Sequence, residues 1–179
     1  MVLRLSCTAA LLIMGCGVTP DDVQPVRYLV INEFMADNRG TWVTDEYGDA
    51  DDWIELYNNA NTACNTGALF CSDDSTRLQR YALPDTVVPP GGYLLFWADG
   101  EVEQGIHHAP FKLSAEDGEE IILSDVRGKV IDRIQFFPRN NNPVARVPDR
   151  SYGREHDGDT VWVQQFEPSP GYENTGGRR

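Results

Sequence analysis

The sequence predicts an all-β protein, built as an antiparallel β-sandwich in one domain. No segment places apolar residues at the i, i+3, i+4 and i+7 spacing of an amphipathic helix. Seven short runs rich in aliphatic, β-branched and aromatic residues alternate instead with clusters of Gly, Pro, Asn and Asp. The chain also has 16 Gly and 11 Pro among its 179 residues, mostly between these runs, which many short strands require.

The expected strands follow in order along the chain. In the second, Ile54 and Leu56 fall on one face and Glu55 on the other, because successive side chains alternate. In the fourth, both faces are apolar, which is typical of a strand packed on both sides. The seven predicted strands cover residues 28–34, 53–58, 69–72, 93–98, 120–124, 130–136 and 161–166.

Turn residues separate these strands. The Pro89-Pro90-Gly91-Gly92 segment precedes the fourth strand. The segment Asp125-Val126-Arg127-Gly128 is expected to close a hairpin between the fifth and sixth strands. The acidic segment 155–159 is expected to form a hairpin loop before the last strand.

The first fifteen residues have the pattern of a signal peptide, in which Arg4 precedes an apolar run from Leu5 to Met14. The run ends at Ile13-Met14-Gly15-Cys16, which resembles the bacterial lipobox. That resemblance implies acyl chains such as palmitate on Cys16, and each buried methylene contributes about 0.8 kcal/mol to membrane attachment. The alternative is an ordinary secretory signal with an unmodified Cys16.

These features predict four parts: a lipoprotein signal peptide (1–15), a lipidated Cys16 with a tether (16–27), the sandwich domain (28–175) and a short tail (176–179). Gly17 stands where inner-membrane retention favours Asp, so we expect the protein at the outer membrane of a bacterial cell envelope. The chain has 15 basic and 28 acidic residues, a formal charge of −13. Without a basic stripe it has nothing to displace the counterions of a polyanion, so nucleic acid is not an expected partner.

Two cysteines remain for the domain, Cys64 and Cys71, with six residues between them. Export to an oxidising compartment predicts a disulfide between them, which would contribute about 2 to 3 kcal/mol at most. A zinc site would need further Cys or His ligands at fixed spacing, and this sequence lacks that pattern.

Several strings, in order along residues 30–174, resemble the lamin tail domain family. They are VINEFMADN (30–38), DWIELYN (52–58), PGGYLL (90–95), HAPFKLS (108–114), VID (130–132), SYGR (151–154) and PSPGYEN (168–174). The resemblance implies an immunoglobulin-like β-sandwich. It implies little about activity, since bacterial members of the family act as modules beside enzymes or alone at the cell surface. The loop at residues 59–69, with its Cys pair, departs from the family's usual turn.

Residues 45–52 place five acids in eight positions just before a strand. Ca²⁺ takes several oxygen ligands from one tight loop, so this segment is a candidate calcium site with Asp45, Asp49 and Asp52 as the expected ligands. The alternative is a solvated acidic loop that keeps a sheet edge soluble. His107 and His108 are adjacent, and on an extended chain their rings point in opposite directions, so a shared metal is not expected.

No nucleophile elbow, phosphate-binding Gly loop, paired metal histidines or positioned Cys/His pair occurs in the sequence. We therefore expect a non-catalytic interaction or scaffold module, anchored by lipid, with a partner among envelope proteins. The other candidate is a calcium-assisted binder of carbohydrate or an envelope polymer, using exposed aromatics such as Trp42 and Tyr47.

Overall fold

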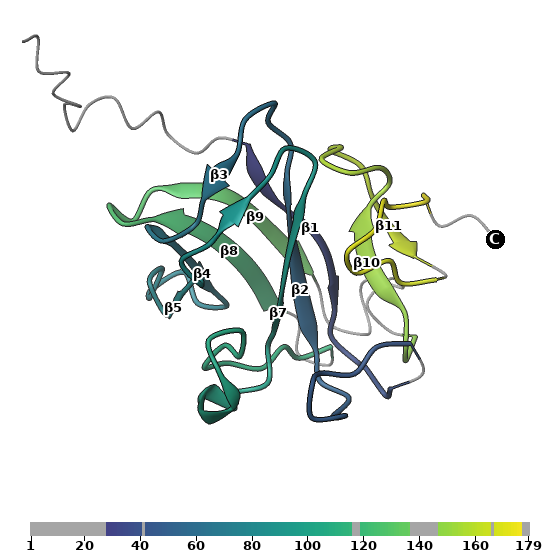
Figure 1. The fold of residues 1–179 in the computed structure, drawn as a ribbon. Coiled ribbons are helices and arrows are strands. Elements are labelled where there is room, and N and C mark those ends of the chain that lie inside the picture. The colour runs from purple at the N-terminus through teal and green to yellow at the C-terminus, as the bar shows by residue number, and fades with distance from the viewer. Residues whose placement is uncertain (1–27, 41, 116–118, 137–146, 166, 177–179) are drawn as a thin grey trace, which may run out of the picture.

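The computed structural model describes residues 28–40, 42–115, 119–136, 147–165 and 167–176. The signal peptide, Cys16 and tether expected at residues 1–27 lie outside the described residues. Within the described part, two antiparallel sheets face each other and a short ribbon lies beside them (Figure 1). No helix in that part has the length and apolar character needed to cross a membrane.

The strands are β1 (Leu29–Met35), β2 (Trp53–Asn58), β3 (Cys64–Asn65), β4 (Leu69–Ser72), β5 (Tyr81–Ala82), β6 (Val87–Val88), β7 (Tyr93–Trp97), β8 (Glu119–Asp125), β9 (Val130–Phe136), β10 (Ser151–Arg154) and β11 (Trp162–Gln165). A single 3-10 turn, η2 (Val102–Gln104), lies between β7 and β8 in the described residues. All seven predicted strands are present to within one residue at either end. The strands β3, β5, β6 and β10 were not predicted.

The first sheet has the order β11-β10-β1-β2-β7, and every neighbouring pair is antiparallel. The β1–β2 register shifts between Ile31 and Glu33, as in a β-bulge. Here the Ile31 N–H donates to Asp132 Oδ2 of β9 at 2.8 Å, across the sandwich. Arg154 Nη2 of β10 donates to the same oxygen at 2.7 Å, so Asp132 joins the two sheets.

The second sheet has the order β5-β4-β8-β9, and β3 and β6 form the separate ribbon. The strands β8 and β9 form the predicted hairpin. In its turn the Gly128 N–H donates to the Asp125 carbonyl at 2.9 Å, and Gly128 has a φ of 72°. The strands β10 and β11 form the other predicted hairpin, joined by residues 155–161.

The main core lies between the two sheets. Phe34 of β1 packs against Phe136 of β9 with ring centroids 4.7 Å apart, and Phe96 of β7 packs against Tyr81 of β5 at 5.2 Å. Each fully buried apolar side chain of this kind contributes about 1.5 to 3 kcal/mol. This face-to-face packing of two antiparallel sheets confirms the predicted sandwich.

The opposite face of the first sheet is also covered. Met35, Trp53 and Trp97 form a second apolar cluster there. The Glu55 side chain points away from the main core, as alternation predicts, but it is fully buried rather than facing water. The C-terminal segment covers it, and the Gly171 N–H donates to Glu55 Oε2 at 2.5 Å.

The two cysteines correct one prediction, because Cys64 and Cys71 are free thiols and form no disulfide. Cys64 lies in the ribbon and Cys71 in the second sheet, where it points into the main core. Burial raises the pKa of both thiols. They pack as small apolar side chains.

Candidate functional site at the acidic end of the sandwich

The acidic end consists of the β1–β2 loop (residues 36–52) and the loop that follows β7 (residues 98–115). Antiparallel pairing brings these loops together. The end of β1, the start of β2 and the end of β7 lie side by side at the same end of the first sheet. Both loops lie at the bottom of the molecule in Figure 1. Residues 107–109 run beside the end of β7, where the Trp97 N–H donates to the His107 carbonyl at 2.8 Å.

The base of the β1–β2 loop is held by Asn38 and Asp52. Asn38 Nδ2 donates to the carbonyls of Val43 and Asp51 at 2.9 and 2.7 Å. The Asn38 N–H donates in turn to Asp52 Oδ1 at 3.1 Å. Burial raises the pKa of Asp52 to about 7, and this hydrogen bond opposes the rise. Asp52 is therefore a structural residue of the loop base.

The tip of this loop is a tight turn around Asp45. Asp45 Oδ1 accepts hydrogen bonds from the N–H groups of Tyr47 and Asp49 at 2.9 and 2.7 Å. The Asp45 N–H donates to the Asp49 carbonyl at 3.0 Å. Gly48, with a φ of 89°, allows the reversal. Asp45 is only 7% exposed, although it lies in a surface loop.

This turn brings together Asp45, Asp49 and Asp51, each of which offers a carboxylate oxygen within 4.8 Å of the others. Two members of the predicted set, Asp45 and Asp49, are therefore adjacent. Asp51 joins them instead of Asp52, which bonds the Asn38 backbone. Alternation explains the difference, because neighbouring side chains of the extended chain entering β2 point in opposite directions.

His108, from the second loop, lies next to this turn, where it approaches Glu46. It is 1% exposed, its Nδ1 bonds Asp99 Oδ2, and its Nε2 lies 3.4 Å from Glu46 Oε1. Burial lowers the pKa of the imidazole, but the bonds to the two carboxylates outweigh burial and raise it above its usual value. His107 is exposed. The two rings thus diverge as predicted, while the buried Asp99–His108 pair was not predicted.

Residues 23–137, well over half of the chain, match the family model of the Lamin Tail Domain. The chain belongs to this family. No curated protein and no solved structure matches it. Both loops of the acidic end lie inside the matched part of the lamin tail domain, whereas β10 and β11 lie beyond it.

One further hydrogen bond joins the two loops of this lamin tail domain. The Tyr47 hydroxyl donates to the Gln104 carbonyl at 3.1 Å. Burial raises the pKa of Asp51, and the charges of Asp99 and Glu101 in the second loop raise it further. Carboxylates of both loops thus lie near one another at the acidic end.

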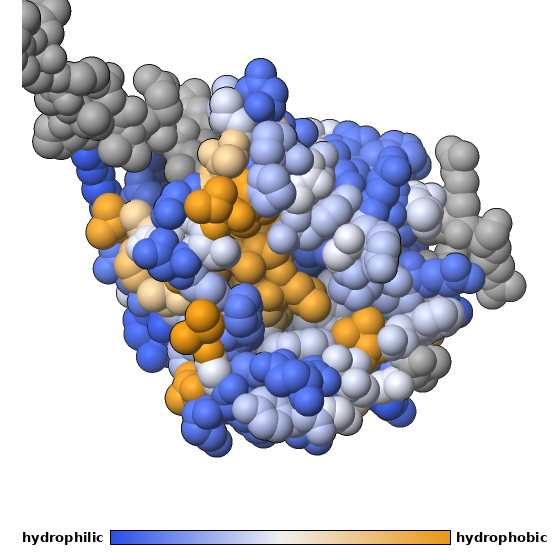
Figure 2. Space-filling model, viewed as in Figure 1, coloured by the Kyte–Doolittle hydropathy of each residue, from blue (hydrophilic) through white to orange (hydrophobic). Residues whose placement is uncertain are grey.

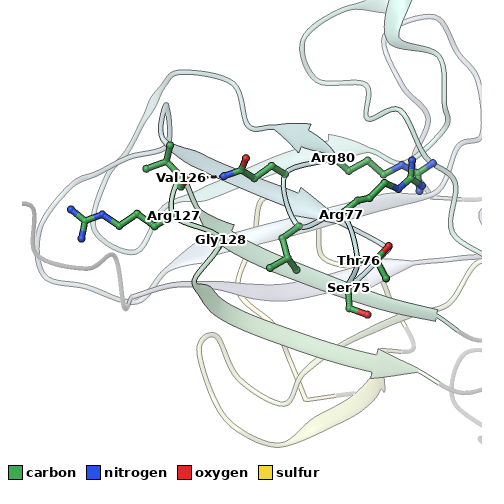
Figure 3. Close-up of a pocket in the computed structure, with 9 residues that line it drawn as sticks. Ser75, Thr76, Arg77, Arg80, Val126, Arg127 and Gly128 are labelled. Atoms are coloured by element: carbon green, nitrogen blue, oxygen red, sulfur yellow. Dashed lines mark hydrogen bonds between the residues drawn. The ribbon is translucent and has the colours of Figure 1, made fainter.

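The lamin tail domain also has an open hollow of about 680 Å³, lined by residues 75–80 and 126–128 (Figure 3). Arg77 and Arg80 of this hollow form ion pairs with Asp74 and Asp73. Arg127 points away from these two in Figure 3. The arginines therefore do not converge on a common anion.

Proposed function

We propose that this lamin tail domain is a non-catalytic interaction module of the bacterial cell envelope, held at the outer membrane by lipid on Cys16. Family membership supports the module, and the lipobox-like string ending at Cys16 supports the anchor. A short lipid-bearing segment before β1 would leave the loops of the sandwich free to bind a partner.

The observation that carries the proposal is an apolar patch on a surface that is otherwise rich in acids. Figure 2 shows hydrophobic side chains gathered over β7, between the β3–β6 ribbon and the loop after β7. In these elements Val87 is 59% exposed, Val102 54% and Ile106 70%. Exposed apolar clusters with a polar rim are typical of protein interaction sites.

The chemistry of the reactive side chains favours binding over catalysis. The Cys64 and Cys71 thiols are buried and their pKa values are raised, whereas a nucleophilic thiol needs a lowered pKa and access to substrate. His108, a candidate base, is enclosed between two carboxylates. We propose that these residues stabilise the fold.

Site-specific photo-crosslinking in cells tests the interaction surface. A photoreactive residue at Ile106 or Val87 is expected to give a discrete crosslinked product with an envelope protein. Val126 is the matched control, because it is equally exposed but lies in the β8–β9 turn. The same products from all three positions would contradict the proposal.

Cell fractionation tests the anchor separately. The wild-type protein is expected in the membrane fraction and Cys16→Ala in the soluble fraction. Membrane association of the variant would overturn lipidation at Cys16 without affecting the crosslinking result.

A second candidate function, glycan or envelope-polymer binding, is favoured by the aromatic side chains of the acidic end. Trp42 and Tyr47 are 49% and 60% exposed, and flat aromatic faces are suitable surfaces for sugar rings. A glycan array run with calcium and with chelator tests it. The absence of signal in both conditions removes this candidate, whereas binding lost in Trp42→Ala and Tyr47→Ala supports it.

A further inference from the structure

We propose that Asp45, Asp49 and Asp51 bind one Ca²⁺ ion at the acidic end. Each residue places a carboxylate oxygen within 4.8 Å of the other two. Because Ca²⁺ binds oxygen at about 2.3 to 2.6 Å, two ligands on opposite sides of one ion are about 4.6 to 5.2 Å apart. The three oxygens therefore have the spacing of ligands that share a single calcium ion.

A second observation, independent of the clustering, concerns the hydrogen bonds of these acids. Asp45 is 93% buried, and its Oδ2 has no hydrogen-bond donor among the described residues. Asp51 Oδ2 is buried and lacks a donor in the same way. Leaving a carboxylate oxygen buried and without a partner is costly. A cation bound between these carboxylates would supply the missing partner.

The surrounding residues add to the demand for positive charge. The carboxylates of Asp99 and Glu101 in the second loop lie near enough to Asp51 to act on it electrostatically, as do those of Asp45 and Asp49. Gln104 Nε2 donates to Glu101 Oε2 at 2.5 Å, while Gln104 Oε1 is a further buried oxygen without a donor in the described part. The second loop thus adds negative charge near Asp51.

The ligand set favours calcium over other common metals. All three ligands are carboxylate oxygens, which suit a hard cation, and the exposed Asp49 leaves room for water to complete the six to eight ligands of Ca²⁺. Mg²⁺ requires a stricter octahedron with shorter bonds. The nearby imidazole of His108, which zinc would favour, already has Asp99 and Glu46 at its two nitrogens.

Calcium here would fix the 45–51 turn against the loop after β7, where Tyr47 already bonds the Gln104 carbonyl. The site goes beyond the interaction function proposed above and does not depend on it. With three carboxylates and the remainder water, we expect a Kd of about 0.1 to 1 mM, the range of extracellular calcium modules.

Calorimetric titration of the full chain in detergent, at constant ionic strength, tests the proposal. We expect one Ca²⁺ per chain and a rise in Tm of about 3 to 10 °C at 10 mM calcium. Mg²⁺ at the same concentration is expected to give less than half of that shift. No binding heat and no Tm change with calcium, or equal shifts with both ions, would overturn the proposal.

Four variants then assign the ligands. Asp51→Asn and Asp49→Asn are expected to weaken calcium binding at least tenfold. Asp52→Asn, which changes the neighbouring acid at the loop base, is expected to stay within threefold of wild type. Glu103→Gln is the matched control, since it removes one exposed acid from the same end, and its affinity should be unchanged within twofold.

Far-UV circular dichroism without calcium confirms that each variant is folded, and the two ligand variants act as independent checks on each other. If Glu103→Gln weakens binding as much as the ligand variants, calcium binding depends on the overall negative charge of the acidic end. The proposed ligands would then be wrong. If Asp52→Asn weakens it as much as Asp51→Asn, the assignment of Asp51 is wrong.

Discussion

Glu55 is a carboxyl group that the fold keeps away from water. Its oxygens accept hydrogen bonds from Asn32 Nδ2 at 3.2 Å and from the Gly171 N–H at 2.5 Å. Burial raises its pKa to about 8, and the charges of Glu33 and Asp157 act in the same direction. At neutral pH the folded protein therefore favours the protonated acid, whereas the unfolded chain favours the carboxylate.

This difference predicts a pH dependence of stability. Because the folded-state pKa of Glu55 is about 8 and the ordinary value is 4.5, its contribution is fully present below pH 4.5 and is lost as pH rises through about 8. The free energy of unfolding should fall between about pH 5 and pH 9. In Glu55→Gln, which is always neutral, the fall should be smaller. Urea unfolding across this pH range measures it, with Glu103→Gln as control, and equal slopes in Glu55→Gln and wild type would contradict the prediction.

The buried thiols give a second prediction at this scale. Neither Cys64 nor Cys71 should be alkylated by iodoacetamide in the folded protein, since both are buried and their pKa values are raised. Both should be alkylated after unfolding in urea without reductant. Peptide mass spectrometry of the segment that contains the two cysteines measures this. Labelling that requires reductant would instead show that a disulfide had formed.

The candidate calcium site shows how far sequence could predict individual residues. The density of acids around Gly48 was enough to predict that the carboxylates of Asp45 and Asp49 lie close together, because a tight turn brings acids together whatever follows it. The choice between Asp51 and Asp52 depends on which side of the chain faces the turn. That is set by the Asn38 N–H bonding Asp52, a contact 14 positions apart that no local pattern contains.

At the scale of elements, long apolar strands were predictable and short or polar ones were not. The strands β3, β5 and β6 have two residues each, too few for any periodicity. The strand β10 holds Gly153 and Arg154 instead of alternating apolar residues. A Cβ at Gly153 would lie 3.1 Å from Glu33 Cγ and 3.2 Å from Asn174 Nδ2, so glycine fits this crowded position. Glycine has a low strand propensity, so local sequence does not predict β10, and tertiary packing accounts for the glycine in this strand.

The β8–β9 turn makes a prediction for an element that sequence placed correctly. Gly128→Ala should destabilise the protein by about 1 to 2 kcal/mol, because alanine is strained at positive φ. Thermal or urea unfolding measures this. Arg127→Ala, an exposed neighbour, should change stability by less than about 0.5 kcal/mol. Equal effects of the two substitutions would show that the turn tolerates a side chain at position 128.

At the scale of the whole molecule, the fold extends beyond the matched region of residues 23–137. The hairpin of β10 and β11 completes the first sheet, and residues 169–174 cover its outer face. Asn174 is central to this cover, since its Nδ2 donates to the carbonyls of Arg154 at 2.9 Å and Asn32 at 3.3 Å. The Asn174 N–H also donates to Asp157 Oδ1 at 3.0 Å.

Loss of this cover should destabilise the entire domain. Asn174→Ala leaves the buried Asn32 and Arg154 carbonyls without this donor and should lower the free energy of unfolding by about 1 to 3 kcal/mol. The exposed neighbour Glu173, changed to Ala, is the control. Urea unfolding followed by Trp fluorescence measures both. If the two variants unfold alike, the C-terminal segment is an accessory to the fold and not part of it.

The central place of β1 has a mechanical consequence. The chain enters the sandwich at Leu29, so a pulling force on the N-terminal segment acts first on this strand. β1 is paired with β2 on one side and β10 on the other, and its Ile31 N–H also bonds Asp132 in the opposite sheet. Extracting it would shear two ladders and this cross-sheet bond together, so the domain should resist a force applied at its N-terminal end.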